Sequence, residues 1–179
     1  IRDPDARTAY DLTLQRIEAL AIAYRHLHES GTETKVEFGR YLTELVTTTS
    51  ANLPGGAQGT DIDVQSEKIT GGLSLAVPLG LIVNELLMNA FKHAFPDRER
   101  GEVLVSLNQV DGPGSALVLV VADDGCGLGS TPTSGTGLAL IQGLARQQDG
   151  TCVIEAASGV RCTVTLRDPQ KARPRSSLN

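Results

Sequence analysis

The segment 77–96 most constrains what this chain can fold into, because it reads as an apolar helix that carries polar side chains along one line. Proline near the start of the segment and proline directly after Phe95 are typical of the entry and the stop of a helix. Aliphatic residues recur at helical spacing and predict one buried face. They are Leu79, Ile82, Val83, Leu86, Ala90 and Ala94. A helix with such a face needs other elements to pack against it.

Four polar residues of the same helix are spaced by four, seven and eight positions and therefore share a second face. They are Glu85, Asn89, Lys92 and His93. On an ordinary amphipathic helix such a face is simply solvated. Its chemistry also suits a site, because carboxylate and amide oxygens are ligands for Mg²⁺ and an ammonium group binds phosphate. The choice depends on whether the rest of the chain supplies a phosphate cradle and a pocket for a base.

Composition limits the possible partners. The chain has 179 residues, enough for one medium domain or for a small domain with an appendage. Its formal net charge of −5 leaves no overall basic surface, so we expect no nucleic-acid partner and no membrane contact. Pro78 and Gly80 interrupt the apolar stretch 73–83, which predicts no membrane span.

The cysteine pattern favours a reducing compartment. Cys126, Cys152 and Cys162 are odd in number and lack the paired spacing of a zinc site. We therefore expect reduced thiols and a cytoplasmic location.

The order of predicted elements indicates the fold class. Helices are expected at 6–29, 38–49 and 138–148, and strands at 36–37, 61–65, 102–108, 116–122, 151–157 and 160–167. The continuous apolar run 116–122 suggests a strand buried on both faces. Helices followed by strands mixed with helices predict an α+β fold, with a mixed sheet covered by helices on one face.

The first predicted helix carries an apolar stripe that needs a partner helix or a second copy of the chain. The stripe consists of Ile17, Leu20, Ala21, Tyr24 and Leu27. We divide the chain into a helical segment 1–32, a compact domain 33–168 and a tail 169–179, whose prolines and serines favour disorder.

Two glycine segments supply the features that the polar helix requires. An Asp-x-Gly-x-Gly sequence, residues 123–127, follows the buried strand, where a carboxylate can accept a hydrogen bond from an exocyclic amine and glycines let a flat ring approach the backbone. Gly135 and Gly137 precede a helix, whose free N–H groups favour an anion. Each motif alone is more often an ordinary turn or helix start, but the order of all three is specific.

With these motifs, the chain from about Arg16 to Arg167 resembles the ATP-binding domain of two-component sensor histidine kinases, the GHKL or Bergerat type shared with DNA gyrase B. Residues 84–95 resemble its N box, 123–128 its G1 box and 135–140 its G2 box. The sequences AVPLGLIVNEL and KHAFP are closest to the branch related to HWE kinases, although the Trp-x-Glu element of that branch is missing. The implied fold is a Bergerat two-layer α/β sandwich preceded by a long amphipathic helix.

The resemblance implies ATP and Mg²⁺ as cofactors. Asn89 would bind Mg²⁺, with Glu85 as a second candidate ligand or a general base, and Lys92 would contact phosphate; these three are the implied catalytic residues. Asp123 would bind the adenine amino group and His93 would lie near the ribose or adenine. The remaining implied nucleotide contacts are Gly125, Gly127, Leu128, Gly135, Thr136, Gly137 and Leu138.

The implied activity is transfer of the γ-phosphoryl of ATP to a histidine, for relay to an aspartate of a response-regulator receiver domain. The acceptor helix would precede Ile1, and His26 and His28 would be surface or hairpin-packing residues of the second helix of a homodimeric hairpin. The loop 129–134 is short for an ATP lid and no F box is visible. Two alternatives therefore stay open: a phosphotransfer or adaptor module that has lost ATP binding, and a GHKL ATPase that uses Glu85 to activate water.

Overall fold

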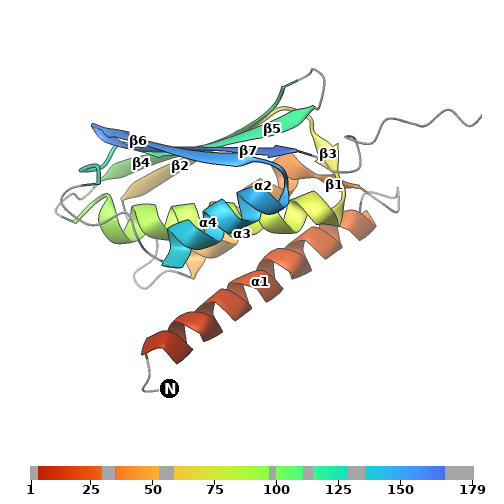
Figure 1. Ribbon diagram of the computed structural model, residues 1–179, viewed down its shortest axis with the longest axis horizontal. Coiled ribbons are helices and arrows are strands. Elements are labelled where there is room, and N and C mark those ends of the chain that lie inside the picture. Colours follow the sequence, from red (N-terminus) through yellow and green to blue (C-terminus); the bar gives the residue numbers. More distant parts are fainter. Residues whose placement is uncertain are drawn as a thin grey trace, which may run out of the picture.

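The computed structural model describes residues 4–29, 35–52, 59–96, 100–110, 115–128 and 136–167. Within these ranges the helices lie on one side of a sheet and form two layers (Figure 1). The helices are α1 (Pro4–Glu29), α2 (Phe38–Ala51), α3 (Leu73–His93) and α4 (Thr136–Gln147). The strands are β1 (Val36–Glu37), β2 (Thr60–Ser66), β3 (Thr70–Gly71), β4 (Gly101–Val110), β5 (Ala116–Asp123), β6 (Thr151–Ala157) and β7 (Gly159–Arg167). The expected α+β class is confirmed.

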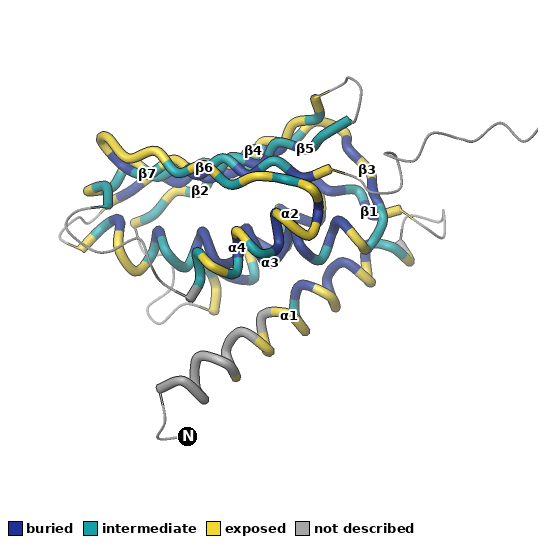
Figure 2. Tube along the Cα trace, in the orientation of Figure 1, coloured by how far each residue is buried: buried dark blue, intermediate teal, exposed yellow. Residues whose placement is uncertain are grey.

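The main sheet has the strand order β2-β4-β5-β7-β6. Strands β2 and β4 are parallel and all other neighbours are antiparallel, so the expected mixed sheet is confirmed. Along β5, Leu117, Leu119 and Val121 are buried against the helices, whereas the alternate residues are only half-buried. The prediction that this strand is buried on both faces is wrong, because helices cover only one face of the sheet (Figure 2).

Helix α3 begins earlier than its sequence suggests. It starts at Leu73, with Gly72 as its N-cap, and continues through Pro78. The sequence predicts the helix entry at this proline. Pro78 has no N–H to bond the carbonyl of Ser74 one turn earlier. Gln148 Nε2 donates a hydrogen bond of 3.3 Å to this carbonyl instead. Gln148, directly after α4, thus replaces the hydrogen bond that Pro78 cannot donate, and the helix is not interrupted.

Helix α3 is the core of the helical layer. By length and composition it could cross a membrane, but 72% of its most apolar window is buried within the fold. Leu79, Ile82, Val83 and Leu87 are among its side chains with no exposed surface. Its apolar character is therefore accounted for by packing against the sheet and the other helices.

Helix α1 packs on the body of the protein with a face other than its predicted apolar stripe. Ala19, Ile22 and Ala23 are buried against the body of the protein. Ile17 is 59% exposed and Tyr24 51% exposed, although both belong to the predicted apolar stripe. Small side chains let α1 approach closely, and most of the bulky stripe remains on the outside.

A polar cluster fixes the end of α1 to α2. His26 is buried, and its Nε2 lies 2.8 Å from Glu44 Oε2. Arg25 Nη2 lies 2.8 Å from the other oxygen of Glu44. His28 is exposed and contacts only the ring of Tyr24 among the aromatic side chains described. His26 therefore packs against α2 of the compact domain.

The C-terminal half follows the sequence closely. The hairpin of β6 and β7 turns at Ser158, and α4 ends before Gly150, as expected. The predicted domain boundary at residue 32 and the tail 169–179, predicted to be disordered, both lie outside the described ranges. Both stay predictions.

The close contact between α3 and α2 can be tested at Gly80. A Cβ at this position would collide with the hydroxyl group of Tyr41, which donates a hydrogen bond of 3.3 Å to the carbonyl of Ala19. We expect Gly80→Ala to lower the free energy of unfolding by about 1–3 kcal/mol, the usual range for overpacking, in urea titrations.

The matched control is Gly143→Ala in α4, where nothing lies within 4 Å of the added Cβ. This change should raise stability by up to about 1 kcal/mol, because alanine has the higher helix propensity. Equal effects of the two substitutions would contradict the proposed packing.

Candidate functional site

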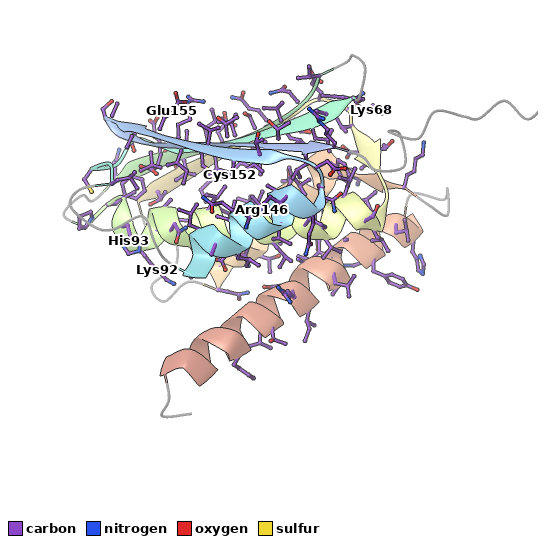
Figure 3. All side chains as sticks on the ribbon, in the orientation of Figure 1. Lys68, Lys92, His93, Arg146, Cys152 and Glu155 are labelled. Atoms are coloured by element: carbon purple, nitrogen blue, oxygen red, sulfur yellow. The ribbon has the colours of Figure 1, made fainter. Side chains whose placement is uncertain are left out.

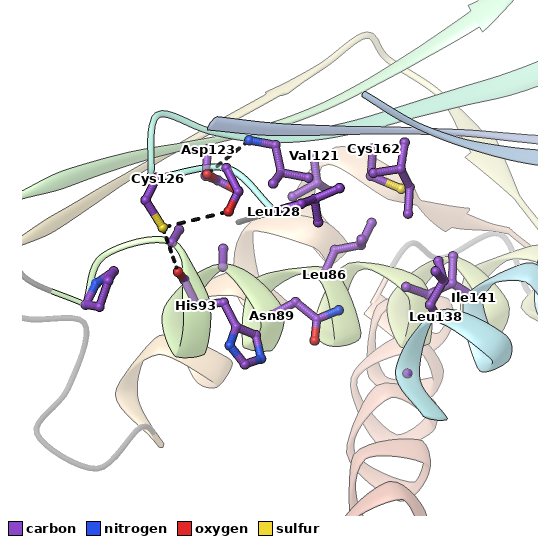
Figure 4. A pocket seen from close by; sticks show the side chains of 17 residues that line it. Leu86, Asn89, His93, Val121, Asp123, Cys126, Leu128, Leu138, Ile141 and Cys162 are labelled. Carbon is purple, nitrogen blue, oxygen red and sulfur yellow. Dashed lines mark hydrogen bonds between the residues drawn. The ribbon is translucent and has the colours of Figure 1, made fainter. Parts of the chain in front are cut away.

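A cavity of about 390 Å³ opens between the last turns of α3, the end of β5, the start of α4 and the β6–β7 hairpin. Its size is in the range of small-molecule sites, and its wall is mainly apolar with a few polar groups. Figure 4 shows Asp123, Cys126 and Leu128 on one side of it, with Asn89 and His93 on the other. The lining residues are Leu86, Asn89, Ala90, His93, Ala94, Pro96, Val121, Asp123, Cys126, Gly127, Leu128, Gly137, Leu138, Ile141, Ile154, Val160 and Cys162.

The carboxylate of Asp123 is oriented by two backbone groups. Its Oδ1 accepts hydrogen bonds from the N–H of Gly125 at 3.0 Å and the N–H of Val160 at 3.2 Å. Both hydrogen bonds are accepted by Oδ1, and Oδ2 takes part in neither of them. A carboxylate held in this way presents an acceptor of fixed direction to a ligand in the cavity.

Glycines permit the close contacts around Asp123. A Cβ at Gly125 would lie 2.5 Å from the carbonyl oxygen of Ala94, so this turn packs directly on the end of α3. Gly127 has φ +77° and Gly159 has φ +104°, a region that side chains disfavour. A Cβ at Gly159 would also collide with the carbonyl oxygen of Asp123. The β6–β7 turn therefore supports the end of β5.

The start of α4 meets α3 at Gly137. A Cβ at Gly137 would lie 2.5 Å from Glu85 Oε2 and 3.9 Å from Asn89 Nδ2. The missing side chain at Gly137 leaves room for the Glu85 carboxylate, whereas the Asn89 amide lies at an ordinary contact distance. The free N–H groups of that turn and the helix dipole favour negative charge at this place.

Glu85 occupies a different environment from Lys92. The Glu85 side chain is buried, and this burial raises the pKa of its carboxyl group, while the nearby Lys92 ammonium partly opposes the rise. Lys92 and His93 are exposed at the end of α3 (Figure 3). The predicted polar line therefore runs from the buried interior of the fold to its surface.

The fold brings together most of the predicted site residues. Seven of them line the cavity: Asn89, His93, Asp123, Gly127, Leu128, Gly137 and Leu138. Glu85, Lys92 and Gly125 do not line it. Glu85 contacts the start of α4 at Gly137, and Gly125, in the turn after Asp123, packs on Ala94 at the end of α3. Gly135 is outside the described residues, and for Thr136, which begins α4, only the backbone is described.

Several residues of this site carry no functional signal in the sequence. Val160 and Gly159 position Asp123 from a hairpin distant in sequence, and only Gly159 carried a signal, as a turn residue. The other missed residues are apolar wall residues or cysteines, including Leu86, Ile141, Ile154 and Cys162. Their sequence pattern indicates burial alone, so it does not distinguish a cavity wall from the core.

Asn89 and Glu85 carry oxygen atoms of the kind that Mg²⁺ binds. Within the described ranges, no group of three or more His, Cys, Asp or Glu side chains could hold a metal ion. Asn89 and Glu85 both lie beside the first turn of α4 and offer one amide and one carboxylate. Mg²⁺ commonly takes one or two such protein ligands together with substrate phosphates and waters.

Comparison with known proteins finds relatives among the histidine kinases. Residues 1–52 match the family model described as histidine kinase. A curated relative, blue-light-activated histidine kinase 2 of Erythrobacter litoralis (strain HTCC2594), is 31% identical over 123 residues. That alignment covers 66% of this chain, and the chain spans about a third of the relative, 34% of its length.

Solved structures share the fold. The histidine kinase domain of a blue-light-activated histidine kinase from Erythrobacter litoralis superimposes with a TM-score of 0.76 at 22% identity, covering 90% of this chain and 76% of that one. A mycobacterial sensor histidine kinase, MprB, gives a TM-score of 0.54 at 24% identity, covering 74% and 95%. Residues 74–171, more than half of the chain and the part that forms the cavity, match the model described as histidine kinase-, DNA gyrase B- and HSP90-like ATPase, and the chain belongs to that family.

Proposed function

We propose that this chain is the ATP-binding catalytic part of a sensor histidine kinase. It transfers the γ-phosphoryl group of Mg-ATP to a histidine outside this chain, for relay to an aspartate of a response-regulator receiver domain. The observation that carries the proposal is the convergence of Asn89, Asp123 and the first turn of α4 on one apolar cavity. Family membership and the histidine kinase match of residues 1–52 support the choice of reaction.

The adenine ring would occupy the apolar part of the cavity, between the end of β5 and the β6–β7 hairpin. Asp123 Oδ2 would accept a hydrogen bond from the exocyclic amine, because Oδ1 is already bonded to two backbone N–H groups. Gly125 and Gly127 would shape the turn beside the ring, with Leu128 on its edge. His93 would lie near the ribose or the adenine.

The phosphates would extend toward the start of α4, where the free N–H groups favour anions. Gly135, Thr136, Gly137 and Leu138 would line this end of the nucleotide. Mg²⁺ would bind Asn89, with Glu85 as a second candidate ligand, and would neutralise phosphate charge during transfer. Lys92 would contact a phosphate from the exposed end of α3.

Burial of Glu85 beside the first turn of α4 favours one competing function. A buried carboxylate at the phosphate end of the site could activate water, which would make the chain a GHKL ATPase. The other alternative, an adaptor that no longer binds ATP, is disfavoured by the cavity, because an adaptor would need no lined pocket of this size. We retain the kinase as the leading function.

The exposed stripe on α1 supports self-association in the intact protein. Tyr10, Leu14, Ile17, Leu20 and Tyr24 are each between 46% and 59% exposed. In the proposed kinase this face packs on the preceding helix of the hairpin and on a second copy. We also propose a cytoplasmic location, where ATP and response regulators are available.

The nucleotide site can be tested by calorimetry with ATP and ADP, with and without Mg²⁺. Asp123→Asn should weaken binding of both nucleotides by about ten- to a hundredfold, the equivalent of one hydrogen bond to a charged group. Asn89→Ala should remove the gain in affinity that Mg²⁺ provides and leave metal-free binding unchanged. Thermal unfolding serves as the folding control, and unchanged affinities in both variants would overturn the site assignment.

The environment of Glu85 predicts a pH dependence of stability. Its raised pKa means that the folded chain keeps a proton at pH values where the unfolded chain, with a pKa of about 4.3, has released it. Stability is therefore lost as pH rises from the unfolded pKa through the folded one.

Glu85→Gln should abolish this loss. In urea titrations the free energy of unfolding of this variant, relative to that of the parent chain, should therefore increase with pH. Lys92→Met removes the opposing ammonium and should make the loss with rising pH larger. The same pH dependence in the parent chain and in Glu85→Gln would show that this carboxyl is not held in a buried environment.

The reaction itself can be tested on a longer chain that includes the segment before Ile1. Incubation with radiolabelled ATP should produce an acid-labile, base-stable label on protein, as expected of phosphohistidine. Free phosphate alone would identify an ATPase, and no binding would identify an adaptor. In the same assay, persistence of the label in Glu85→Gln would exclude this carboxylate as an essential base.

A further inference from the structure

Two cysteines face each other across the β6–β7 hairpin. Cys152 Sγ and Cys162 Sγ lie 3.6 Å apart, and both thiols are free. In the strand register Cys152 is opposite Val164 and Cys162 is opposite Ile154, so the two cysteines form a diagonal pair. Both belong to the side of the sheet that faces the helices, since Cys162 is buried and Cys152 packs against the core.

The two thiols differ in exposure and in acidity. Cys162 is only 1% exposed, whereas Cys152 is half-buried. Figure 3 labels Cys152, and Figure 4 labels Cys162. The hydrogen bond from the Cys162 thiol lowers the pKa of Cys152, and the same bond raises the pKa of Cys162. Since the thiolate is the nucleophile, Cys152 is the thiol that reacts first and Cys162 the one that resolves the product.

We propose that Cys152 and Cys162 form an oxidation site, at which a hydroperoxide converts the two thiols into an intramolecular disulfide that lowers the affinity of the neighbouring cavity for nucleotide. The oxidation site stands on the geometry of the pair alone. Its effect on nucleotide affinity rests on the proposed function.

The chemistry balances in two steps. With hydrogen peroxide as the oxidant, the Cys152 thiolate attacks one peroxide oxygen. An S–O bond forms, the O–O bond breaks, and the leaving hydroxide takes up the proton released by the Cys152 thiol to become water. The Cys162 sulfur then attacks the Cys152 sulfenic acid. An S–S bond forms, the S–O bond breaks, and the hydroxyl group leaves with the Cys162 proton as a second water. The pair loses two electrons, and the peroxide is reduced.

Bond formation must move the edge of the sheet. The sulfur atoms have to approach from 3.6 Å to about 2.0 Å, and diagonal partners in an antiparallel pair have Cα atoms about 7–8 Å apart, beyond the usual disulfide range. Strand β6 is at the edge of the main sheet and pairs only with β7 within the described ranges, so it is the element that can shift.

This shift would reach the nucleotide cavity directly. Ile154 and Cys162, which are opposite each other in the register, both line the cavity. Pulling β6 toward Cys162 changes the wall that they form. The same hairpin carries Val160, whose N–H orients Asp123. A disulfide that displaces strands in this way is readily reduced by cellular thiols, so the modification is reversible.

The first test measures thiols and does not depend on nucleotide. After treatment with hydrogen peroxide, two of the three thiols should be lost, and peptide mass mapping should find residues 152 and 162 joined. Dithiothreitol should restore both thiols. Cys126→Ser should still form the bond, whereas Cys152→Ser and Cys162→Ser should not. Absence of the 152–162 disulfide in the parent chain would overturn the proposal.

The second test compares ATP affinity of the reduced and oxidised chain. We expect oxidation to weaken binding about tenfold or more, reversibly, and to have no such effect on Cys152→Ser, whose side chain does not line the cavity. An unchanged affinity of the disulfide form would overturn the coupling. Failure of the reduced chain to bind ATP would count against the proposed function alone, because the thiol measurement is independent of it.

Discussion

The burial of α3 against one face of the sheet determines the arrangement of the rest of the structure. This helix is surrounded by the sheet and by α1, α2 and α4, so each of its polar side chains must find a partner on a neighbouring element or reach the cavity. Asn84 is 3% exposed and accepts a hydrogen bond of 2.8 Å from Thr49 of α2. Glu85, one residue later, points to the first turn of α4, and Asn89 reaches the cavity. Because successive helix positions point in different directions, Asn84 faces α2, Glu85 faces α4 and Asn89 faces the cavity.

Close approaches at glycine bring these neighbours into contact. Gly80 admits the Tyr41 hydroxyl, Gly137 admits the Glu85 carboxylate, and Gly125 lets the turn after β5 rest on Ala94. At each place the missing side chain lets a functional or core element come nearer than any other residue would permit. Close contacts that depend on glycine therefore occur in the core, at Gly80, and beside the cavity, at Gly125 and Gly137.

The fold class and seven of the 17 residues that line the cavity could be predicted, because periodicity and motif order encode them. Helical spacing identified α3, and the Asp123 and Gly137 motifs identified two further walls of the cavity. The start of α3 could not be predicted, since the partner that compensates for Pro78 is Gln148, distant in sequence. The apolar stripe of α1, predicted to need a partner helix or a second copy of the chain, is largely exposed. The face that packs on the body of the protein, around Ala19 and Ala23, could not be predicted, because its small side chains give a weak apolar signal. The contribution of Gly159 and Val160 depends on strand pairing that sequence patterns do not reveal.

The β6–β7 hairpin connects the Asp123 side of the cavity with the edge of the sheet. Its turn supports the end of β5 through Gly159, and its Val160 N–H holds the Asp123 carboxylate. Strand β6 itself pairs with only β7 among the described strands, so it has fewer contacts to hold it than any central strand. Of the two strands, only β6 is at the edge, whereas β7, which carries Gly159 and Val160, also pairs with β5. Within the sheet, a shift of β6 is therefore opposed by β7 alone among the described strands, and a further strand beside β6 would hold Cys152, and Ile154 of the cavity wall, more rigidly.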